Sequence, residues 1–302
     1  MHSRVITSMA TAAVLWAAVG CTSDSSNGDA GPLPTDRSAG TFVVGLEHDG
    51  LQREAVVYVP DSYDAAADTP LVLNFHGFSG GARYHMNDSS LEPQADRSGA
   101  ILVAPQGAEL DGSPHWNPVP LGGDNKSSVD DFGFLEALLE AIQAAYPYNA
   151  ARVSAVGYSN GGMMAMGLAC ERSELIASAA TMSGAMLDFG CELSKPMSAM
   201  VIHGTQDFTI PYDGNGDYRS AREVVDYWRS ENATDDAQEV TITDGGTTIN
   251  HWAYEGGTAG TAVHYYLVQG GYHEWIRFSA DGTASNDLLW DFLTGFSTAG
   301  RL

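Results

Sequence analysis

The stretch Gly157-Tyr158-Ser159-Asn160-Gly161-Gly162 follows a short apolar run, residues 153–156, and opens a segment rich in small residues and methionine. Gly-x-Ser-x-Gly is typical of a sharp turn from a strand into a helix, which lifts the serine hydroxyl above the carboxyl edge of a parallel sheet. Glycines flank the serine because the turn is too tight for side chains. The stretch predicts an α/β fold with Ser159 as nucleophile. Such a pattern also arises by chance in a chain with 34 glycines, so Ser159 needs partners.

Two downstream segments supply candidates for these partners. Asp207 comes shortly after the apolar run 199–203, and His273 comes shortly after the run 263–268. A nucleophilic serine needs a histidine that takes its proton and a carboxylate that orients the imidazole. The order serine, acid, histidine is that of α/β-hydrolases, and each candidate follows a predicted strand. We therefore expect Ser159, Asp207 and His273 to form a catalytic triad.

Other polar residues have less favourable positions for catalysis. His203 falls inside or at the end of its strand, where a structural histidine is the default interpretation. His264 falls in mid-strand, and His85 and His251 fall in helical or polar surface context. Asp213 and Asp217 lie in a Gly/Asn-rich loop, and Ser183 lacks the glycine on its N-terminal side.

A loop after the predicted strand 71–75 is a candidate for the oxyanion hole. It reads His76-Gly77-Phe78-Ser79-Gly80-Gly81, and such a loop normally supplies one backbone N–H, with a second from the residue after the nucleophile. We therefore expect the N–H groups of Phe78 and Asn160 to bind the oxyanion. His76 is expected to fix the loop and not to act in catalysis.

The rest of the chain predicts one doubly wound, mostly parallel sheet with helices on both faces. Short apolar runs indicate the strands, and apolar residues at helical spacing indicate the helices. The expected strands are 41–46 and 54–59, joined at Asp49-Gly50 as an antiparallel hairpin, followed by 71–75, 100–104, 152–156, 199–203 and 263–268. Three helices are expected. The first covers about 132–142 and starts at Ser128 and Asp131, the second covers 221–228 and starts with a capping box of Ser220 and Glu223, and the third covers 288–296. Residues 231–262 are polar and predict a surface hairpin.

The first twenty residues predict an export signal. Arg4 precedes an apolar run, residues 5–19, that is too short to span a membrane as a helix. Gly20-Cys21 resembles the end of a bacterial lipoprotein signal, which implies lipidation at Cys21, although Ala18 stands where leucine is usual; plain secretion is the alternative. We expect a signal peptide at 1–20, a flexible tether at 21–40 and a catalytic domain at 41–302.

Charge and cysteine content exclude several classes of function. Without residues 1–20 the chain has 13 basic and 38 acidic residues, a net charge of 13 − 38 = −25. Such a surface repels nucleic acids and anionic lipids, so a membrane contact is expected only through a lipid at Cys21. Cys170 and Cys191 are expected to form a disulfide in an exported protein. No metal-ligand spacing is present near them, and the chemistry calls for no cofactor.

The ordered set of motifs resembles the polyhydroxybutyrate depolymerase / feruloyl esterase family of secreted α/β-hydrolases. The matching stretches are 75–77, 105–107, 130–134, 157–164, 203–207 with 211–212, 271–275 and 290–292. The resemblance covers about residues 41–296 and implies the same triad, Ser159, Asp207 and His273. Two departures lie beside His273: Tyr272 replaces a common glycine, and Ile276-Arg277 replaces Pro-Gly. They affect the expected acyl or leaving-group preference.

We therefore expect an extracytoplasmic serine carboxylic-ester hydrolase acting through an acyl-enzyme. Feruloyl, acetyl and short hydroxyalkanoate esters, some linked to polysaccharide, all fit as substrates. Trp116 and Trp275 are candidate substrate-binding residues; for Trp116, stacking on a phenolic group or sugar and a core-capping role are equally plausible. Two other interpretations stay open: an inactive hydrolase-fold binding lipoprotein, and a peptidase of the same fold.

Overall fold

A computed structural model describes residues 30–120, 123, 125–187, 190 and 193–302. The predicted signal peptide, Cys21 and Cys191 lie outside the described residues. Within the described ranges, none of the helices has the length and apolar character that crossing a bilayer requires.

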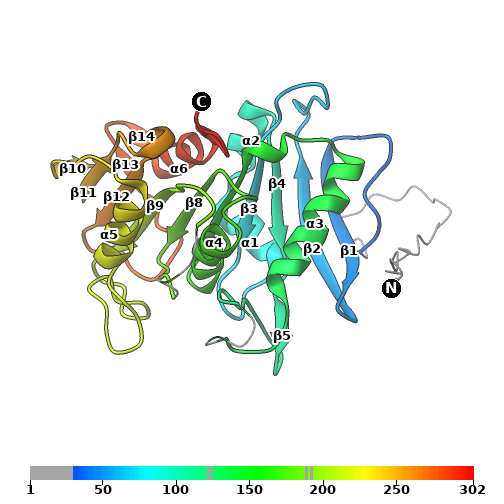
Figure 1. Ribbon diagram of the computed structural model, residues 1–302, viewed down its shortest axis with the longest axis horizontal. Helices are drawn as coiled ribbons and strands as arrows, with labels where there is room; N and C mark the ends of the chain where they lie inside the picture. The colour runs from blue at the N-terminus through cyan, green and yellow to red at the C-terminus, as the bar shows by residue number, and fades with distance from the viewer. Residues whose placement is uncertain (1–29, 121–122, 124, 188–189, 191–192) are drawn as a thin grey trace, which may run out of the picture.

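A ten-stranded sheet runs through the molecule (Figure 1). In spatial order its strands are β1 (Gly40–His48), β2 (Leu51–Val59), β4 (Ile101–Pro105), β3 (Leu71–Phe75), β7 (Val153–Tyr158), β8 (Ser178–Met182), β9 (Ser198–Gly204), β12 (Val263–Val268), β11 (Thr247–Tyr254) and β10 (Val240–Asp244). The six from β4 to β12 are parallel, and antiparallel pairs extend both edges. Three two-stranded ribbons lie outside it: β5 (Ala108–Leu110) with β6 (Ser113–His115), β13 (Ser279–Ala280) with β14 (Thr283–Ala284), and β15 (Phe296–Ser297) with β16 (Gly300–Arg301).

Helices cover both faces of this sheet, which makes it doubly wound. The helices are α1 (Ala82–Ser89), α2 (Glu92–Ser98), α3 (Asp131–Ala145), α4 (Asn160–Glu171), α5 (Ala221–Asn232) and α6 (Ser285–Thr294), with 3-10 turns η1 (Ala150–Arg152) and η2 (Thr258–Gly260). One hydrophobic core packs α3, α4 and α5 against the sheet, and a second packs α1, α2 and α6 against the other face (Figure 1). The parallel strands are buried on both faces, which is why they read as continuous apolar runs.

Most of the predicted elements are present, with three corrections. Asp130, and not Ser128, caps α3, because its carboxylate accepts from the N–H of Gly133. The polar segment 231–262 does contain a hairpin, β10 to β11, but β11 pairs with β12 and so extends the main sheet. β8, α1 and α2 were not predicted from the sequence. The predicted capping box of Ser220 and Glu223 is confirmed at α5.

Candidate active site

Ser159 sits at the strand-to-helix turn between β7 and α4. Its backbone has φ 54° and ψ −122°, a conformation that is costly for a residue with a side chain and recurs where function requires it. A Cβ on Gly157 would lie 2.2 Å from the backbone of Gly161, and one on Gly161 would lie 2.2 Å from the carbonyl oxygen of Phe75. Both positions therefore require glycine, and the turn holds the Ser159 hydroxyl at the carboxyl edge of the sheet.

The three predicted triad residues form one hydrogen-bonded series. Nε2 of His273 lies 3.0 Å from Oγ of Ser159, and Nδ1 of His273 lies 2.8 Å from Oδ2 of Asp207. Ser159 follows β7, Asp207 follows β9 and His273 follows β12, so parallel strand ends bring the three loops to one edge. The Asp207 side chain is fully buried, whereas that of His273 is 18% exposed. This arrangement can transfer a proton from the serine hydroxyl to the imidazole.

The carboxyl group of Asp207 is held by four donors. Oδ1 accepts from the N–H groups of Thr209 and Ile210, at 3.0 and 2.9 Å. Burial by itself would raise the pKa of Asp207, but hydrogen bonds from His203, His273 and the Ile210 N–H outweigh it and hold that pKa below its usual range. Asp207 is therefore ionised at neutral pH and can orient the imidazole.

Two further residues contact the triad, and the sequence did not predict either contact. Tyr158 donates its hydroxyl to the carbonyl oxygen of His273 at 2.9 Å, and its ring lies 5.0 Å from the imidazole. His203, assigned a structural role from its strand position, lies with Nε2 3.4 Å from Oδ2 of Asp207 and 2.7 Å from the carbonyl oxygen of Ile210. The four-residue spacing from His203 to Asp207 was the available signal for this contact.

Hydrogen bonds to the His76 side chain and within the loop hold the peptide groups of the loop after β3. Nδ1 of His76 lies 2.7 Å from the carbonyl oxygen of Gly77, which also accepts from the N–H of Gly80. The N–H of Gly107 donates to Nε2 of His76, so Nδ1 carries the proton. Burial lowers the pKa of His76 to about 4, which keeps this ring neutral at pH 7.

These contacts set the direction of the Phe78 N–H. The Gly77–Phe78 peptide is trans, so this N–H points away from the held Gly77 carbonyl oxygen. A Cβ on Gly77 would lie 3.3 Å from Cβ of Ser159, so the loop passes over the serine. Asn160 begins α4, and an N–H in a helix's first turn has no partner within the helix. The backbone N–H groups of Phe78 and Asn160 can therefore donate hydrogen bonds to an oxygen that becomes negatively charged during the reaction.

Trp116 does not have the exposure that a stacking role requires. Its side chain is fully buried, packs edge-on against Phe75 at 5.2 Å and donates its indole N–H to the carbonyl oxygen of His76. The backbone of Trp116 is hydrogen-bonded twice to the Asn160 side chain, at 2.8 and 3.1 Å. Of the two roles left open for Trp116, the buried ring fits the core-capping one, beneath the oxyanion loop, and not stacking on a substrate.

The prediction that Trp275 contacts substrate is wrong for the same reason. Its side chain is 3% exposed, lies edge-on to His85 at 5.4 Å and donates its indole N–H to Asn286. Both indoles stabilise the loops that carry site residues. The sequence did not indicate this burial, because a tryptophan in a loop can be either buried in the core or exposed to a ligand.

A hollow of about 350 Å³ adjoins the nucleophile turn. It is lined in part by Trp116, Pro118, Lys126, Met163 and Tyr218, of which Trp116, Pro118 and Met163 are buried, and it reaches Asn160. The volume is within the range of small-molecule sites. This hollow is the candidate space for one side of an ester substrate.

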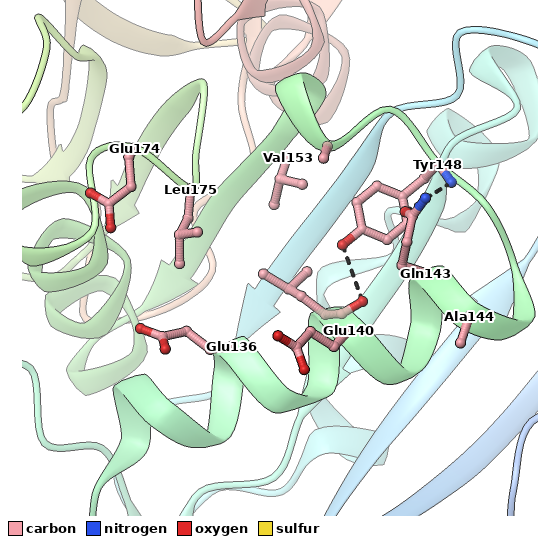
Figure 2. A pocket seen from close by; sticks show the side chains of 10 residues that line it. Glu136, Glu140, Gln143, Ala144, Tyr148, Val153, Glu174 and Leu175 are labelled. Atoms are coloured by element: carbon pink, nitrogen blue, oxygen red, sulfur yellow. Dashed lines mark hydrogen bonds between the residues drawn. The ribbon is translucent and has the colours of Figure 1, made fainter. Parts of the chain in front are cut away.

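A larger hollow of about 650 Å³ lies elsewhere (Figure 2). Leu139, Tyr148, Val153 and Leu175 form its apolar part, with three glutamates around them. Val153 begins β7 whereas Ser159 follows its end, so the two sites are about 20 Å apart on opposite edges of the sheet. The larger hollow is therefore separate from the candidate active site.

The expectations about metal ligands and a disulfide concern residues other than the triad. Among the described residues, one group of histidine and acids has its ligand atoms within 4.8 Å of one another: His48, Asp49 and Asp130. His48 is hydrogen-bonded to Asp130, which also caps α3, so these contacts account for two of the three side chains. Cys170 is buried in α4, but Cys191 lies outside the described residues, so their bridge stays a prediction.

Comparison with solved structures defines the fold. The acetyl xylan esterase from Aspergillus awamori superimposes with a TM-score of 0.61 over 80% of this chain and 93% of its own, at 14% sequence identity. A mostly parallel sheet with helices on both faces and a serine at the β7–α4 turn is the α/β-hydrolase fold, and this prediction is confirmed.

The chain belongs to the Esterase family, whose model ("Putative esterase") matches residues 50–281. It is 25% identical over 250 residues to the "Probable feruloyl esterase C" of Aspergillus terreus, covering 80% of this chain and 84% of that protein. It is 30% identical over 169 residues to feruloyl esterase C of Emericella nidulans, covering 54% of this chain and 57% of that protein. These findings make the chain a carboxylic ester hydrolase and confirm the feruloyl esterase resemblance; the polyhydroxybutyrate depolymerase resemblance stays a prediction.

Proposed function

We propose that the chain is a serine esterase that works through an acyl-enzyme formed on Ser159. The hydrogen-bonded series from Ser159 through His273 to the buried Asp207 is the observation that carries the proposal. The His273 imidazole accepts the serine proton as Oγ attacks the ester carbonyl, and then gives that proton to the leaving alcohol. Water repeats the sequence on the acyl-enzyme. Asp207 keeps Nδ1–H of His273 oriented throughout.

The N–H groups of Phe78 and Asn160 are proposed to bind the oxyanion of each tetrahedral intermediate. The fixed Gly77 carbonyl and the start of α4 support this assignment. A helix N-terminus adds favourable potential for a developing negative charge. Losing one such donor typically costs ~3 kcal/mol of transition-state stabilisation.

Ser159→Ala tests the nucleophile assignment. The variant is expected to lose nearly all turnover of p-nitrophenyl acetate while keeping the wild-type melting temperature. A serine-reactive phosphonate should add one label to the wild type, and peptide mapping should find it at Ser159 and not at Ser183. Retained turnover in Ser159→Ala, or a label elsewhere, would disprove the mechanism.

We propose feruloyl and acetyl esters carried on polysaccharide as the main substrate class, with short hydroxyalkanoate esters as a third candidate. Relatives and a solved neighbour with feruloyl and acetyl xylan esterase names support the first two. A panel of methyl ferulate, acetylated xylan and hydroxybutyrate oligomers ranks them by kcat/KM. A clear preference for the oligomers would reject the ranking proposed here.

We further propose that the protein acts outside the cytoplasm, attached by lipid at Cys21. The charged start, the apolar run 5–19 and the Gly20-Cys21 pair support this proposal. Radiolabelled palmitate should enter the wild-type protein and the membrane fraction, and Cys21→Ser should release an unlabelled protein. An unlabelled wild type in the medium would point to plain secretion.

A further inference from the structure

A buried ion pair joins β2 to the start of α3. Nη2 of Arg53 donates to Oδ1 of Asp131 at 2.7 Å, and both side chains are almost fully buried. Cζ of Arg53 also lies 3.9 Å from the centre of the Phe134 ring. Oδ2 of Asp131 accepts from the N–H of Asn117 at 2.9 Å. A carboxylate and an aromatic ring therefore set the position of the Arg53 guanidinium.

Stability alone gives a weak reason for this ion pair. Taking two charges out of water is costly, and well-packed apolar residues often replace a buried pair without loss of stability. Nη1 of Arg53 is buried and has no hydrogen-bond partner in the part of the chain that the structure describes. Burial raises the pKa of Asp131, and the Arg53 charge and the Asn117 N–H oppose this effect. The charge of Arg53 therefore calls for a further role, and its remaining contact indicates one.

This contact leads from Arg53 toward the oxyanion loop. Nη2 of Arg53 donates to the carbonyl oxygen of Gln106 at 3.2 Å. The same peptide group carries the N–H of Gly107, which donates to Nε2 of His76 at 2.9 Å. The peptide is trans, so its oxygen and its N–H point in opposite directions. One peptide group therefore connects the guanidinium of Arg53 to the ring of His76.

The His76 ring extends this connection to the oxyanion loop. Because Nε2 of His76 accepts, Nδ1 carries the proton and donates to the carbonyl oxygen of Gly77 at 2.7 Å. The same peptide group carries the N–H of Phe78. Burial chiefly lowers the pKa of His76 to about 4, and the Arg53 charge adds to the effect, so at pH 7 the ring is neutral and Nε2 can accept. We refer to this series of donors and acceptors as the relay: Arg53, Gln106–Gly107, His76 and Gly77–Phe78.

We propose that Arg53 is a positioning residue for the oxyanion site and acts through the relay; this inference rests on the proposed function. A positive charge stands at one end of the relay, and the negative charge of the tetrahedral intermediate develops at the other end, beside the Phe78 N–H. Hydrogen bonds in such a series polarise one another, so Arg53 strengthens the last donor as well as holding it in place. Asp131 fixes the direction of the guanidinium.

Two double variants test the relay, and each removes both buried charges so that neither is left alone. Arg53→Gln with Asp131→Asn keeps a side-chain N–H that can donate to the Gln106 oxygen, and we call it the donor variant. Arg53→Met with Asp131→Asn has no such N–H, and we call it the no-donor variant. On p-nitrophenyl acetate the no-donor variant should lose about tenfold in both kcat and kcat/KM, less than the roughly 10²–10³-fold cost of losing an oxyanion donor outright. The donor variant should recover part of this loss.

A transition-state analogue separates positioning from a general effect on the structure. A trifluoromethyl ketone gains an oxyanion when Oγ of Ser159 adds to its carbonyl carbon and the serine proton passes to His273, so it reports on the oxyanion site without turnover. Its inhibition constant should rise by about tenfold in the no-donor variant, in step with the loss of kcat/KM. Arg152→Met with Asp68→Asn is the matched control. It removes an ion pair just before β7, at the sheet edge opposite Ser159, and should match the wild type in both measurements.

The serial arrangement gives a second test. His76→Phe removes both ring nitrogens and interrupts the relay in the middle. Because the groups act in series, adding the no-donor substitutions to His76→Phe should lower kcat hardly more than His76→Phe does alone. Losses that multiply would mean that Arg53 acts independently of His76 and would overturn the relay.

The outcomes separate this inference from the proposed function. If Ser159 takes the phosphonate label while the no-donor variant keeps the wild-type kcat and inhibition constant, the relay is wrong and the acyl-enzyme mechanism stands. Failure of the label at Ser159 would instead reject the proposed function. Melting temperatures show which variants fold. If the double variants do not fold, Arg53→Lys replaces them, because its nitrogen is one bond short of the Gln106 oxygen while its charge stays near Asp131. Arg53→Lys should lose kcat several-fold, and an unchanged kcat would overturn the relay.

Discussion

Nε2 of His203 lies 3.4 Å from Oδ2 of Asp207, the same carboxylate oxygen that receives Nδ1 of His273. Nε2 of His203 also donates to the carbonyl oxygen of Ile210 at 2.7 Å. The side chains of His203 and Asp207 are both almost fully buried. A single N–H therefore ties the triad acid to the loop that follows it, and His203 is a positioning residue for Asp207.

His203→Leu removes this donor, whereas His203→Gln can keep an N–H near the same place. Because a hydrogen bond to a charged group contributes about 1.5–3 kcal/mol, we expect His203→Leu to lower kcat by at least about tenfold with little change in KM. His203→Gln should recover much of that loss. Steady-state kinetics on p-nitrophenyl acetate measure both. Equal activity of the two variants would remove His203 from this role.

The order and location of the triad were predictable because each member follows a strand of strong apolar character. β3 and β12 have the bounds that their apolar runs predicted. β8 was missed because Ser178–Met182 is made of small residues and gains its strand character from neighbours on both sides. α1 and α2 are short and carry few apolar residues, so no helical period was detectable.

The side-chain contacts around the triad could not be predicted in this way. Burial of Trp116 and Trp275, and the hydrogen bonds of Tyr158 and Asn160, depend on which loops meet at the sheet edge. A sequence pattern fixes the strand that a loop follows, but the direction of each loop side chain depends on packing between distant segments. Positions of site residues were therefore easier to predict than their partners.

Acid should destabilise the protein partly through His85. Burial lowers the pKa of His85 to about 3, and its Nε2 lies 2.8 Å from Oδ1 of Asn74. In the unfolded chain the pKa of His85 is close to the ordinary histidine value of about 6.5, so below that pH the unfolded state binds more protons than the folded state. The stability that His85 contributes is complete above pH about 6.5 and is lost as pH falls toward 3, at up to ~1.4 kcal/mol per pH unit.

Urea unfolding at pH 7, 6 and 5 measures this effect. The free energy of unfolding of the wild type should fall with pH more steeply than that of His85→Gln, which has no group to titrate. The difference between the two slopes should approach ~1.4 kcal/mol per pH unit below pH about 6. Parallel slopes would mean that His85 does not contribute to acid unfolding.

Gly157→Ala should prevent the turn that carries Ser159. The new Cβ would lie 2.2 Å from the backbone of Gly161, and backbone cannot move aside as a flexible side chain can. We expect loss of turnover together with a destabilisation above about 3 kcal/mol, seen as a lower melting temperature or insoluble protein. Gly31→Ala is the matched control, because its Cβ would meet open space. A stable and active Gly157→Ala would contradict the close approach of Gly157 to Gly161, on which the assignment of Ser159 depends.

Asn160 should support the oxyanion site through its side chain as well as its N–H. The side chain accepts from the N–H of Trp116 and donates to the carbonyl oxygen of Trp116. Asn160→Ala leaves both backbone groups of Trp116 unpaired, which should cost about 1–3 kcal/mol of stability each and lower kcat more than it changes KM.

Asn160→Asp keeps the acceptor but turns a carboxylate oxygen toward the Trp116 carbonyl oxygen. Protonation of the new carboxyl group would restore a donor, so the melting temperature of Asn160→Asp relative to Asn160→Ala should rise as pH falls below about 5. An unchanging difference between the two variants across pH would show that the Trp116 carbonyl does not need this donor.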